Sequence, residues 1–298
     1  MKYNKQPLVS VIMPVYNAEA YLAHAINSIL SQTIQDIEFV IVDDASTDNS
    51  YKIAHDYALR DHRIKLYRNK KNSGVSKTAK IAIDHSTGQF IARMDADDIA
   101  LPERFAKQVK YLKANPKTVA VGAQCLLIDK DGTIIGQKNF PTKFEDIYKY
   151  IFQFVPVQQP TLMINRKLLP EDFQFYRDGM NTAEEIELIF KLFMYGKVEN
   201  LPDVLLMYRV HNGNTSFKNI KKTFFLTIIS RIMAIFDYKY RPTVFGIIVT
   251  LLQVIMVLTL SSKMIFWLYS MTRKTALYHR ISFLPVNRFS LSLARESA

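Results

Sequence analysis

The first 130 residues alternate short apolar, β-branched runs with longer segments in which apolar positions recur every three or four residues. Short apolar runs bounded by polar residues predict buried strands, and the longer period predicts helices. Strands are predicted at residues 8–13, 38–42, 64–67 and 90–94, with helices at 20–31, 50–59 and 76–83 between them. This alternation is typical of a parallel sheet with crossover helices, so we expect an α/β fold.

The pattern continues less regularly to residue 210. A helix is predicted at 102–112 with a proline at its start, which the missing proline N–H allows. Further strands are predicted at 119–128 and 204–210, and a helix at 182–194. A hairpin is expected at the turn Asp129-Lys130-Asp131-Gly132, whereas the segment 144–160 is ambiguous.

Composition limits the class of protein. The chain has 298 residues, of which 49% are apolar and 22% charged, so it can bury a sizeable core. A single cysteine, Cys125, excludes an intrachain disulfide and a cysteine-based zinc site, which fits a reducing compartment. Residues 1–8 lack the apolar stretch of a secretory signal, so we do not expect export.

The net charge of +12 is concentrated at the C-terminal end. Residues 218–298 hold 12 Lys and Arg against 2 acidic residues, and they also contain the longest apolar run, 244–260. A basic region beside an apolar one predicts a membrane-surface element. No zinc-finger spacing or RNA-recognition motif is present, so we expect no nucleic-acid partner.

The apolar run is 17 residues long, at the short limit for a membrane span, and both of its flanks are basic. A single span would place one basic flank outside, against the positive-inside tendency. We therefore expect a helical, membrane-associating tail over 218–298. It would lie on, or re-enter, the cytoplasmic face of the plasma membrane and bind anionic lipid. The alternative is an ordinary helix packed on the domain formed by residues 1–217.

Polar residues at the ends of the predicted strands are the candidates for chemistry, because open parallel sheets bind ligands there. Asp95, Asp97 and Asp98 follow the strand 90–94. Three carboxylates in so short a segment repel one another unless a cation lies among them, and Mg²⁺ or Mn²⁺ shared with a nucleotide diphosphate would suit them. The alternative is an acidic loop favoured by the dipole of the following helix.

A second acidic pair, Asp43-Asp44, ends another predicted strand and is followed by a helix-capping run. Asp44 could accept a hydrogen bond from a base or ribose, and Tyr16 could offer a stacking face. The glycines form neither a dinucleotide-binding nor a P-loop motif. Phosphate would then be held by a metal together with a cation such as Lys77, Lys80 or Arg209.

Glu184-Glu185 precede an apolar helical pattern. With Thr182 they have capping-box spacing, in which Glu185 serves only the helix terminus. A carboxylate at this position could instead deprotonate an acceptor hydroxyl. Downstream, His211 follows a predicted strand and offers an imidazole to the same sheet edge, either as a metal ligand or as a packed side chain.

Five motifs in order resemble glycosyltransferase family 2, the inverting enzymes of GT-A fold, over residues 8 to about 216. They are VSVIMPVYNAEAYLAHAINSILSQT (9–33), FVIVDDASTD (39–48), NSGVS (72–76), GQFIARMDADDIALPERFAKQ (88–108) and NLPDVLLMYRVHNGNTS (200–216). The resemblance implies a mixed GT-A sheet with helices on both faces. It also implies transfer of a sugar from a nucleotide diphosphate, usually a UDP-sugar, to a saccharide or glycolipid acceptor in cell-surface polysaccharide or lipopolysaccharide synthesis.

By this resemblance, Tyr16 and Asp44 hold the base and Asp95 the ribose side, while Asp97, with His211 as a further candidate ligand, holds Mn²⁺ or Mg²⁺. Glu185 is the catalytic base. The chain departs from the family pattern at two places: Glu184-Glu185 stands where Glu-Asp is usual, and Ala79-Lys80 where Arg-Asn is usual, so Lys80 could supply the missing cation.

Three other functions remain open from the residues. A nucleotidyltransferase would also use an Asp-x-Asp metal site, but it would not be expected to carry the YRVH ending. A polyprenyl-phosphate sugar transferase of the same superfamily would suit the basic, apolar tail. A non-catalytic nucleotide-sugar-binding module would explain the departures at Glu185 and Ala79.

Overall fold

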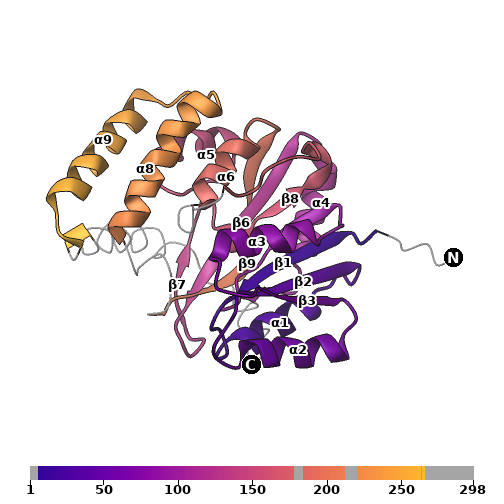
Figure 1. Cartoon of the computed structure of the whole chain (residues 1–298). Helices are drawn as coiled ribbons and strands as arrows, with labels where there is room; N and C mark the ends of the chain where they lie inside the picture. Colours follow the sequence, from indigo (N-terminus) through magenta and orange to yellow (C-terminus); the bar gives the residue numbers. More distant parts are fainter. Residues whose placement is uncertain (1–5, 178–183, 212–219, 263, 266–298) are drawn as a thin grey trace.

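The computed structural model describes residues 6–177, 184–211, 220–262 and 264–265. Within them, a nine-stranded mixed sheet runs through the molecule with helices on both faces (Figure 1). The strand order is β3-β2-β1-β4-β8-β6-β9-β5, and β7 pairs with β6 at the side. The strands are β1 (Val9–Val15), β2 (Ile37–Asp43), β3 (Ile64–Arg68), β4 (Phe90–Arg93), β5 (Ile99–Ala100), β6 (Thr118–Ile128), β7 (Ile134–Lys138), β8 (Met163–Asn165) and β9 (Lys197–Arg209).

Strand direction brings distant parts of the chain to one edge of the sheet. β1 pairs in parallel with β2 and β4, and β2 with β3. β8 runs antiparallel to both β4 and β6, so β6 points the same way as β4, and β9 is parallel to β6. The carboxyl ends of β1, β2, β4 and β9 therefore share the edge at which a parallel sheet binds ligands.

Two apolar layers cover the sheet, because side chains alternate between its faces. Val11 and Met13 of β1 pack with α1 (Leu22–Leu30), α2 (Ser50–Arg60) and α4 (Arg104–Ala114). Ile12, between them, joins the opposite layer with α3 (Val75–Asp84), α5 (Phe144–Tyr150) and α6 (Glu184–Leu192). Helices on both faces of a mixed sheet confirm the predicted α/β class.

The four strands and three helices predicted over the first 94 residues are confirmed to within about two residues at most ends. The helix predicted to begin at Pro102 begins instead at Arg104, with Glu103 as its N-cap. Pro102 belongs to the preceding turn, where its carbonyl accepts a hydrogen bond from the Thr33 N–H at 3.0 Å. The last predicted strand is also longer than expected and starts at Lys197.

The ambiguous segment 144–160 forms α5 and the beginning of a 3₁₀ turn, Gln159–Thr161. The turn at Asp129 to Gly132 joins β6 to β7 as an antiparallel hairpin, as predicted. Strands β5 and β8 were not predicted. They have two and three residues, too few for a pattern, and they form because β9 and β4 offer them partners.

Two further helices, α8 (Ile220–Asp237) and α9 (Val244–Thr259), lie beyond α5 and α6 at one end of the molecule (Figure 1). α9 coincides with the predicted apolar run. The Tyr238 hydroxyl, just after α8, donates to Glu187 Oε1 of α6 at 2.7 Å. Across the described ranges, no helix is both long enough and apolar enough to cross a membrane. The proposed boundary at 217 and the basic residues beyond 265 lie outside the described residues.

Candidate functional site

The loops that follow β1 and β2 are locked together at the carboxyl edge. The Asn17 N–H donates to Ser46 Oγ at 3.0 Å, and Asn17 Oδ1 accepts from the Thr47 N–H at 2.9 Å. Asn17 and Ala45 have φ values of 48° and 58°, a left-handed conformation that is strained for alanine and often retained at functional sites. Tyr16, beside them, is 49% exposed, so its ring can receive a flat ligand.

Asp44 holds a third loop at this edge. One of its carboxylate oxygens accepts from the Asn69 amide at 2.7 Å and from the Ser73 N–H at 2.8 Å, and the other accepts from the Gly74 N–H at 2.9 Å. Gly74 is the N-cap of α3, with φ of 89°. Asp44 thus fixes the loop between β3 and α3. Its predicted contact with a base stays a prediction.

Asp95 lies directly after β4 and is held by Arg93, which donates to Asp95 Oδ1 from Nε at 3.0 Å and from Nη2 at 2.9 Å. Burial, with Arg93 opposing it and Asp97 adding to it, raises the pKa of Asp95. The guanidinium of Arg104 is wholly buried and donates to the Arg93 carbonyl at 2.8 Å. This hydrogen bond holds the backbone at the end of β4 in place. The Arg93 Nη1 atom has no hydrogen-bond partner among the described residues.

Asp97 and His211 come together although 114 residues separate them. His211 Nε2 lies 2.9 Å from Asp97 Oδ2, and the two side chains are 20% and 25% exposed. The His211 ring also rests against Tyr21, with the ring centroids 5.0 Å apart. The two predicted metal ligands therefore form one pair, and both side chains stay partly exposed to solvent.

A carboxylate and an imidazole are suitable donors for Mn²⁺, and a carboxylate for Mg²⁺. Two protein ligands leave positions for phosphate and water, as these ions prefer when they bind nucleotides. The residues present therefore fit the predicted ion, and Asp97 and His211 are the ones that would hold it. No group of three or more His, Cys, Asp or Glu side chains that could hold a metal occurs in the described part of the chain.

Asp98 and Arg209 fasten the acidic loop to β9. Asp98 is buried and accepts from the Arg209 N–H at 2.8 Å, and its burial, together with Asp97 and Asp95, raises its pKa well above the usual range. The Arg209 side chain donates to the carbonyls of Asp97 at 2.9 Å and of Asp129 at 2.9 Å. Arg209 thus braces the loop, and the phosphate contact considered for it stays a prediction.

Glu184 and Glu185 begin α6 and share an electrostatic environment with the Asp95 region. Glu184 is buried, and its burial and then the charge of Glu185 raise its pKa to about 8. Burial also raises the pKa of Glu185, with Asp95 contributing and Arg93 opposing. Glu185, the predicted base, thus interacts electrostatically with Asp95 and Arg93, and its catalytic role stays a prediction. Thr182, on which the capping-box alternative depends, lies outside the described residues.

Lys80, another predicted site residue, pairs with a carboxylate of its own helix. Its ammonium lies 3.0 Å from Asp84 Oδ2, one turn further along α3, and both side chains are more than a third exposed. An exposed pair of this kind contributes little to stability and can exchange partners. Its contact with phosphate stays a prediction.

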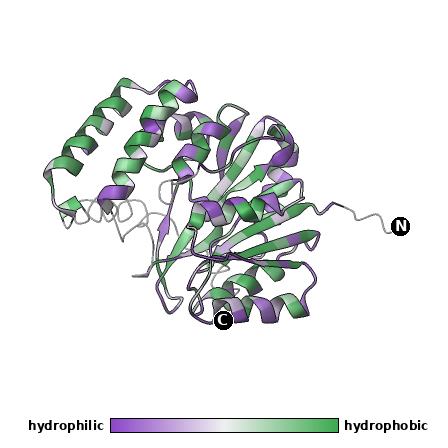
Figure 2. Ribbon diagram, in the orientation of Figure 1, coloured by the Kyte–Doolittle hydropathy of each residue, from purple (hydrophilic) through white to green (hydrophobic). Residues whose placement is uncertain are grey.

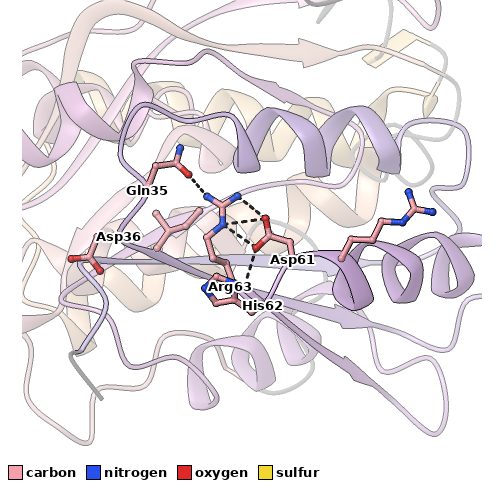
Figure 3. A pocket seen from close by; sticks show the side chains of 7 residues that line it. Gln35, Asp36, Asp61, His62 and Arg63 are labelled. Atoms are coloured by element: carbon pink, nitrogen blue, oxygen red, sulfur yellow. Dashed lines mark hydrogen bonds and ion pairs between the residues drawn. The ribbon is translucent and has the colours of Figure 1, made fainter. Parts of the chain in front are cut away.

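A surface pocket lies away from these residues, at the amino ends of β2 and β3 (Figure 3). Arg63 is its central cation and pairs with Asp61, with Nη2 2.6 Å from Oδ2, and it also donates to Gln35. Because this guanidinium is already paired and the pocket is at the opposite edge from Asp95 and Asp97, we assign the functional site to the carboxyl edge.

Sequence reasoning missed Arg93, Arg104 and the burial of Glu184. A signal for Arg93 was present, since it is the one charged residue in the apolar stretch from Phe90 to Met94. A charge in a buried strand is costly unless it is paired, so its position alone pointed to a partner nearby. Arg104 gave no such signal, because arginine is ordinary in a helix.

Comparison with known proteins identifies the family. Residues 10–173 match Glycosyl transferase family 2. The chain is 32% identical over 219 residues to an uncharacterized glycosyltransferase of Haemophilus influenzae, covering 70% of this chain and 68% of that one. It is 35% identical over 225 residues to the putative glycosyltransferase EpsE of Bacillus subtilis (74% and 79% covered). It is 30% identical over 218 residues to the O-antigen biosynthesis glycosyltransferase WbnJ of Escherichia coli (70% and 82%).

Solved structures show the same fold. A structure of S. aureus TarS with UDP-GlcNAc has a TM-score of 0.60 at 19% identity, and the match covers 75% of this chain and 66% of that one. The chain thus spans slightly less than two thirds of that TarS chain. The mannosyltransferase PcManGT of Pyrobaculum calidifontis, in complex with GDP-Man and Mn²⁺, has a TM-score of 0.56 at 17% identity, with 90% and 81% covered. With the family match over more than half of its length, the chain belongs to glycosyltransferase family 2 and is a glycosyltransferase.

Proposed function

We propose that the chain is an inverting glycosyltransferase that moves a sugar from a UDP-sugar to a hydroxyl of a saccharide acceptor during synthesis of a cell-surface polysaccharide. The observation that carries this proposal is the electrostatic interaction of two sets of carboxylates with one buried arginine, Arg93. Asp95 and Asp97 follow β4, and Glu184 and Glu185 begin α6, with Arg93 interacting with both sets. An O-antigen enzyme among the relatives supports the surface-polysaccharide assignment.

The donor nucleotide would lie across the ends of β1, β2 and β4. Tyr16 offers an exposed ring for the base, and Asp44 keeps the Asn69 to Gly74 loop in place beside it. UDP is favoured over other nucleotides because the TarS neighbours were solved with UDP and with UDP-GlcNAc. Asp95, held by Arg93, would contact the ribose side.

Asp97 and His211 would hold Mn²⁺ or Mg²⁺, which supplies positive charge for the leaving diphosphate. The PcManGT neighbour contains Mn²⁺ with its GDP-sugar, which supports this assignment. The unpartnered Nη1 donor of Arg93 could add a second positive contact for an anionic group. Neutralising the diphosphate matters because negative charge accumulates there as the bond to the sugar breaks.

Glu185 would act as the base on the acceptor side. In the proposed reaction, its carboxylate takes the proton from the acceptor hydroxyl as that oxygen bonds to the anomeric carbon. On the opposite face of this carbon, the bond to the diphosphate breaks and its electron pair leaves with the nucleotide. This in-line geometry inverts the anomeric configuration. Burial raises the pKa of Glu185, which makes its carboxylate a stronger proton acceptor.

The proposal is tested by thermal unfolding of the full chain with UDP-hexoses, UDP-N-acetylhexosamines and GDP-mannose, each with and without Mn²⁺. A ligand that binds only the folded state raises its stability. We expect one UDP-sugar to raise the unfolding temperature in a Mn²⁺-dependent way, and Tyr16→Ala to remove that shift. A shift with GDP-mannose alone would contradict the UDP assignment, and a shift independent of Mn²⁺ would contradict the metal site.

Turnover with the sugar so identified then tests the reaction. The anomeric configuration of the product distinguishes inversion from retention, and a retained configuration would overturn the proposed mechanism. Transfer to a soluble saccharide also separates this function from sugar transfer to a polyprenyl phosphate.

A further inference from the structure

In the α8–α9 hairpin (Ile220–Asp237 and Val244–Thr259), α9 has its polar residues toward the protein and large apolar residues toward solvent. On α9, Gly246 and Thr250 are buried. Thr250 Oγ1 donates to the Phe152 carbonyl at 3.1 Å, and Gln253 Nε2 donates to the Gln153 carbonyl at 3.0 Å. The opposite face of α9 is apolar and 48% to 77% exposed at Val244, Phe245, Ile248, Leu251, Leu252, Ile255 and Leu258.

Helix α8 shares this arrangement in part. Ser230 and Arg231 are buried, and the Arg231 guanidinium donates to Thr250 Oγ1 at 3.4 Å and to Gln253 of α9. Phe225 and Phe236 of α8 are 58% and 77% exposed, whereas Ile228 and Ala234 of the same helix are buried. The polar contacts join the two helices to each other and to the segment after α5, and most large apolar side chains of α9 remain outside.

A helix on the surface of a globular domain normally has the opposite distribution, with its apolar stripe toward the core. Figure 2 shows α9 predominantly hydrophobic although it lies at the outer end of the molecule. A contiguous apolar surface of this kind marks an interaction site with a protein or a membrane. The polar contacts of Thr250, Gln253 and Arg231 fix the orientation of the hairpin. This orientation leaves the apolar face of α9 exposed.

The charges on the hairpin indicate which partner covers this face. Lys221 and Lys222 lie at the start of α8, Lys239 and Arg241 lie between the helices, and Asp237 is the one acidic residue from 220 to 265. A second copy docked through a twofold axis would bring the same cations together. An anionic lipid surface accepts basic residues at both ends of the hairpin and apolar side chains between them.

We propose that the α8–α9 hairpin seats the enzyme on an anionic membrane surface, with the outer face of α9 among the acyl chains and the basic residues at both ends against lipid headgroups. The cytoplasmic leaflet, which carries the anionic lipids, is the surface that this chemistry fits. Tyr238, the residue that follows α8, also donates a hydrogen bond to Glu187 of the acidic helix α6. The hairpin therefore places the acceptor side of the site close to the bilayer. This surface is independent of the nucleotide or sugar that the enzyme uses.

The experiment is cosedimentation of the full chain with phosphatidylglycerol vesicles and with phosphatidylcholine vesicles. We expect strong, salt-sensitive binding to the first and weak binding to the second. The triple variant Leu252→Ser, Ile255→Ser, Leu258→Ser should lose binding to both. Leu59→Ser is its matched control, because Leu59 is 74% exposed on α2. That control should bind vesicles as the unaltered chain does.

A second pair of variants tests the charges. Lys239→Glu with Arg241→Glu should lower affinity for phosphatidylglycerol vesicles at least roughly 25-fold, since each basic residue near an anionic surface is worth about fivefold. Lys52→Glu, at an exposed position on α2, should change it little.

Unchanged vesicle binding by the triple variant would overturn the proposal. So would failure of the unaltered chain to bind phosphatidylglycerol. If the triple variant instead converts a dimer into a monomer in light scattering, with no vesicle binding by the unaltered chain, the partner is a second copy and the proposal is wrong. The shift in unfolding temperature caused by the donor sugar should be the same in every variant as in the unaltered chain. This control shows whether a variant has lost membrane binding alone or donor binding as well.

Discussion

The two glutamates at the start of α6 should respond in opposite ways when each is replaced by glutamine. The pKa of Glu184 is raised to about 8, first by burial and then by Glu185, so most of this carboxyl is protonated at pH 7. Glutamine resembles the protonated form in size and lack of charge. Glu185 is less buried and is the proposed base, which must be ionised to accept a proton.

The effect of Glu184 on stability has a definite sign. Its folded-state pKa lies above the unfolded value of 4.5, so its contribution to stability is fully present below pH 4.5 and is lost as the pH rises through 8. At about 1.4 kcal/mol for each tenfold change in proton affinity, this loss is roughly 5 kcal/mol by pH 9. Glu184→Gln should therefore match the unaltered protein at pH 5 and unfold at higher urea concentration at pH 9.

Urea unfolding at pH 5, 7 and 9 measures this difference, and turnover at pH 7 measures the other half of the prediction. Glu185→Gln should lower turnover by on the order of a hundredfold or more, within the range of general-base catalysis, with donor affinity unchanged. Glu184→Gln should keep most of the activity. The reasoning would be refuted if Glu184→Gln gained no stability at pH 9, or if it lost turnover while Glu185→Gln retained it.

Three further predictions concern the metal site, the opposite edge of the sheet and the packing of β6. Asp97→Ala should remove Mn²⁺-dependent turnover and leave the circular dichroism spectrum unchanged; wild-type turnover across a Mn²⁺ titration would contradict the metal assignment. Glu38 is buried, which raises its pKa, but hydrogen bonds from Lys65, Ser10 and Thr87 lower that pKa to about 2. Glu38→Gln should thus cost on the order of 3 kcal/mol at pH 7, measured by urea unfolding, and the difference should shrink as the pH falls from 4.5 to 2. Gly122→Ala would place a methyl group 2.2 Å from Asn200 Oδ1 and 2.8 Å from a Val157 methyl, so it should destabilise the fold by about 2 kcal/mol. Unchanged unfolding of this variant would show that β6 can shift.

The parts of the fold that depend on local pattern were predictable from sequence, and those that depend on distant partners were not. The strands Val9–Val15 and Ile37–Asp43 are buried along almost their whole length, so a continuous apolar run marked them. β8 has three residues and exists because β4 and β6 pair with it on both sides. No short-range signal identifies a strand of that kind.

The candidate site likewise has features that local sequence predicts and features that depend on distant residues. The position of Asp97 after a strand indicated its place at the sheet edge, and its pairing with His211 follows from the shared direction of β4 and β9. The difference between Glu184 and Glu185 could not be predicted, because it depends on which of two adjacent side chains the rest of the protein covers. Whether Lys80 would pair with Asp84 or with a ligand was equally undetermined by spacing.

The hydrogen bond from the Arg209 N–H to Asp98, across 111 residues of chain, has a consequence for biosynthesis. A nascent chain that has emerged as far as Asp98 already contains the acidic loop, but the strand that braces this loop is completed only at Arg209. Until then, Asp98, one of the three carboxylates of this loop, lacks its backbone donor. We therefore expect the ability to bind a nucleotide-sugar donor to appear only after β9 has been synthesised to its last residue. Ribosome-bound chains that end before residue 209 should bind no nucleotide sugar.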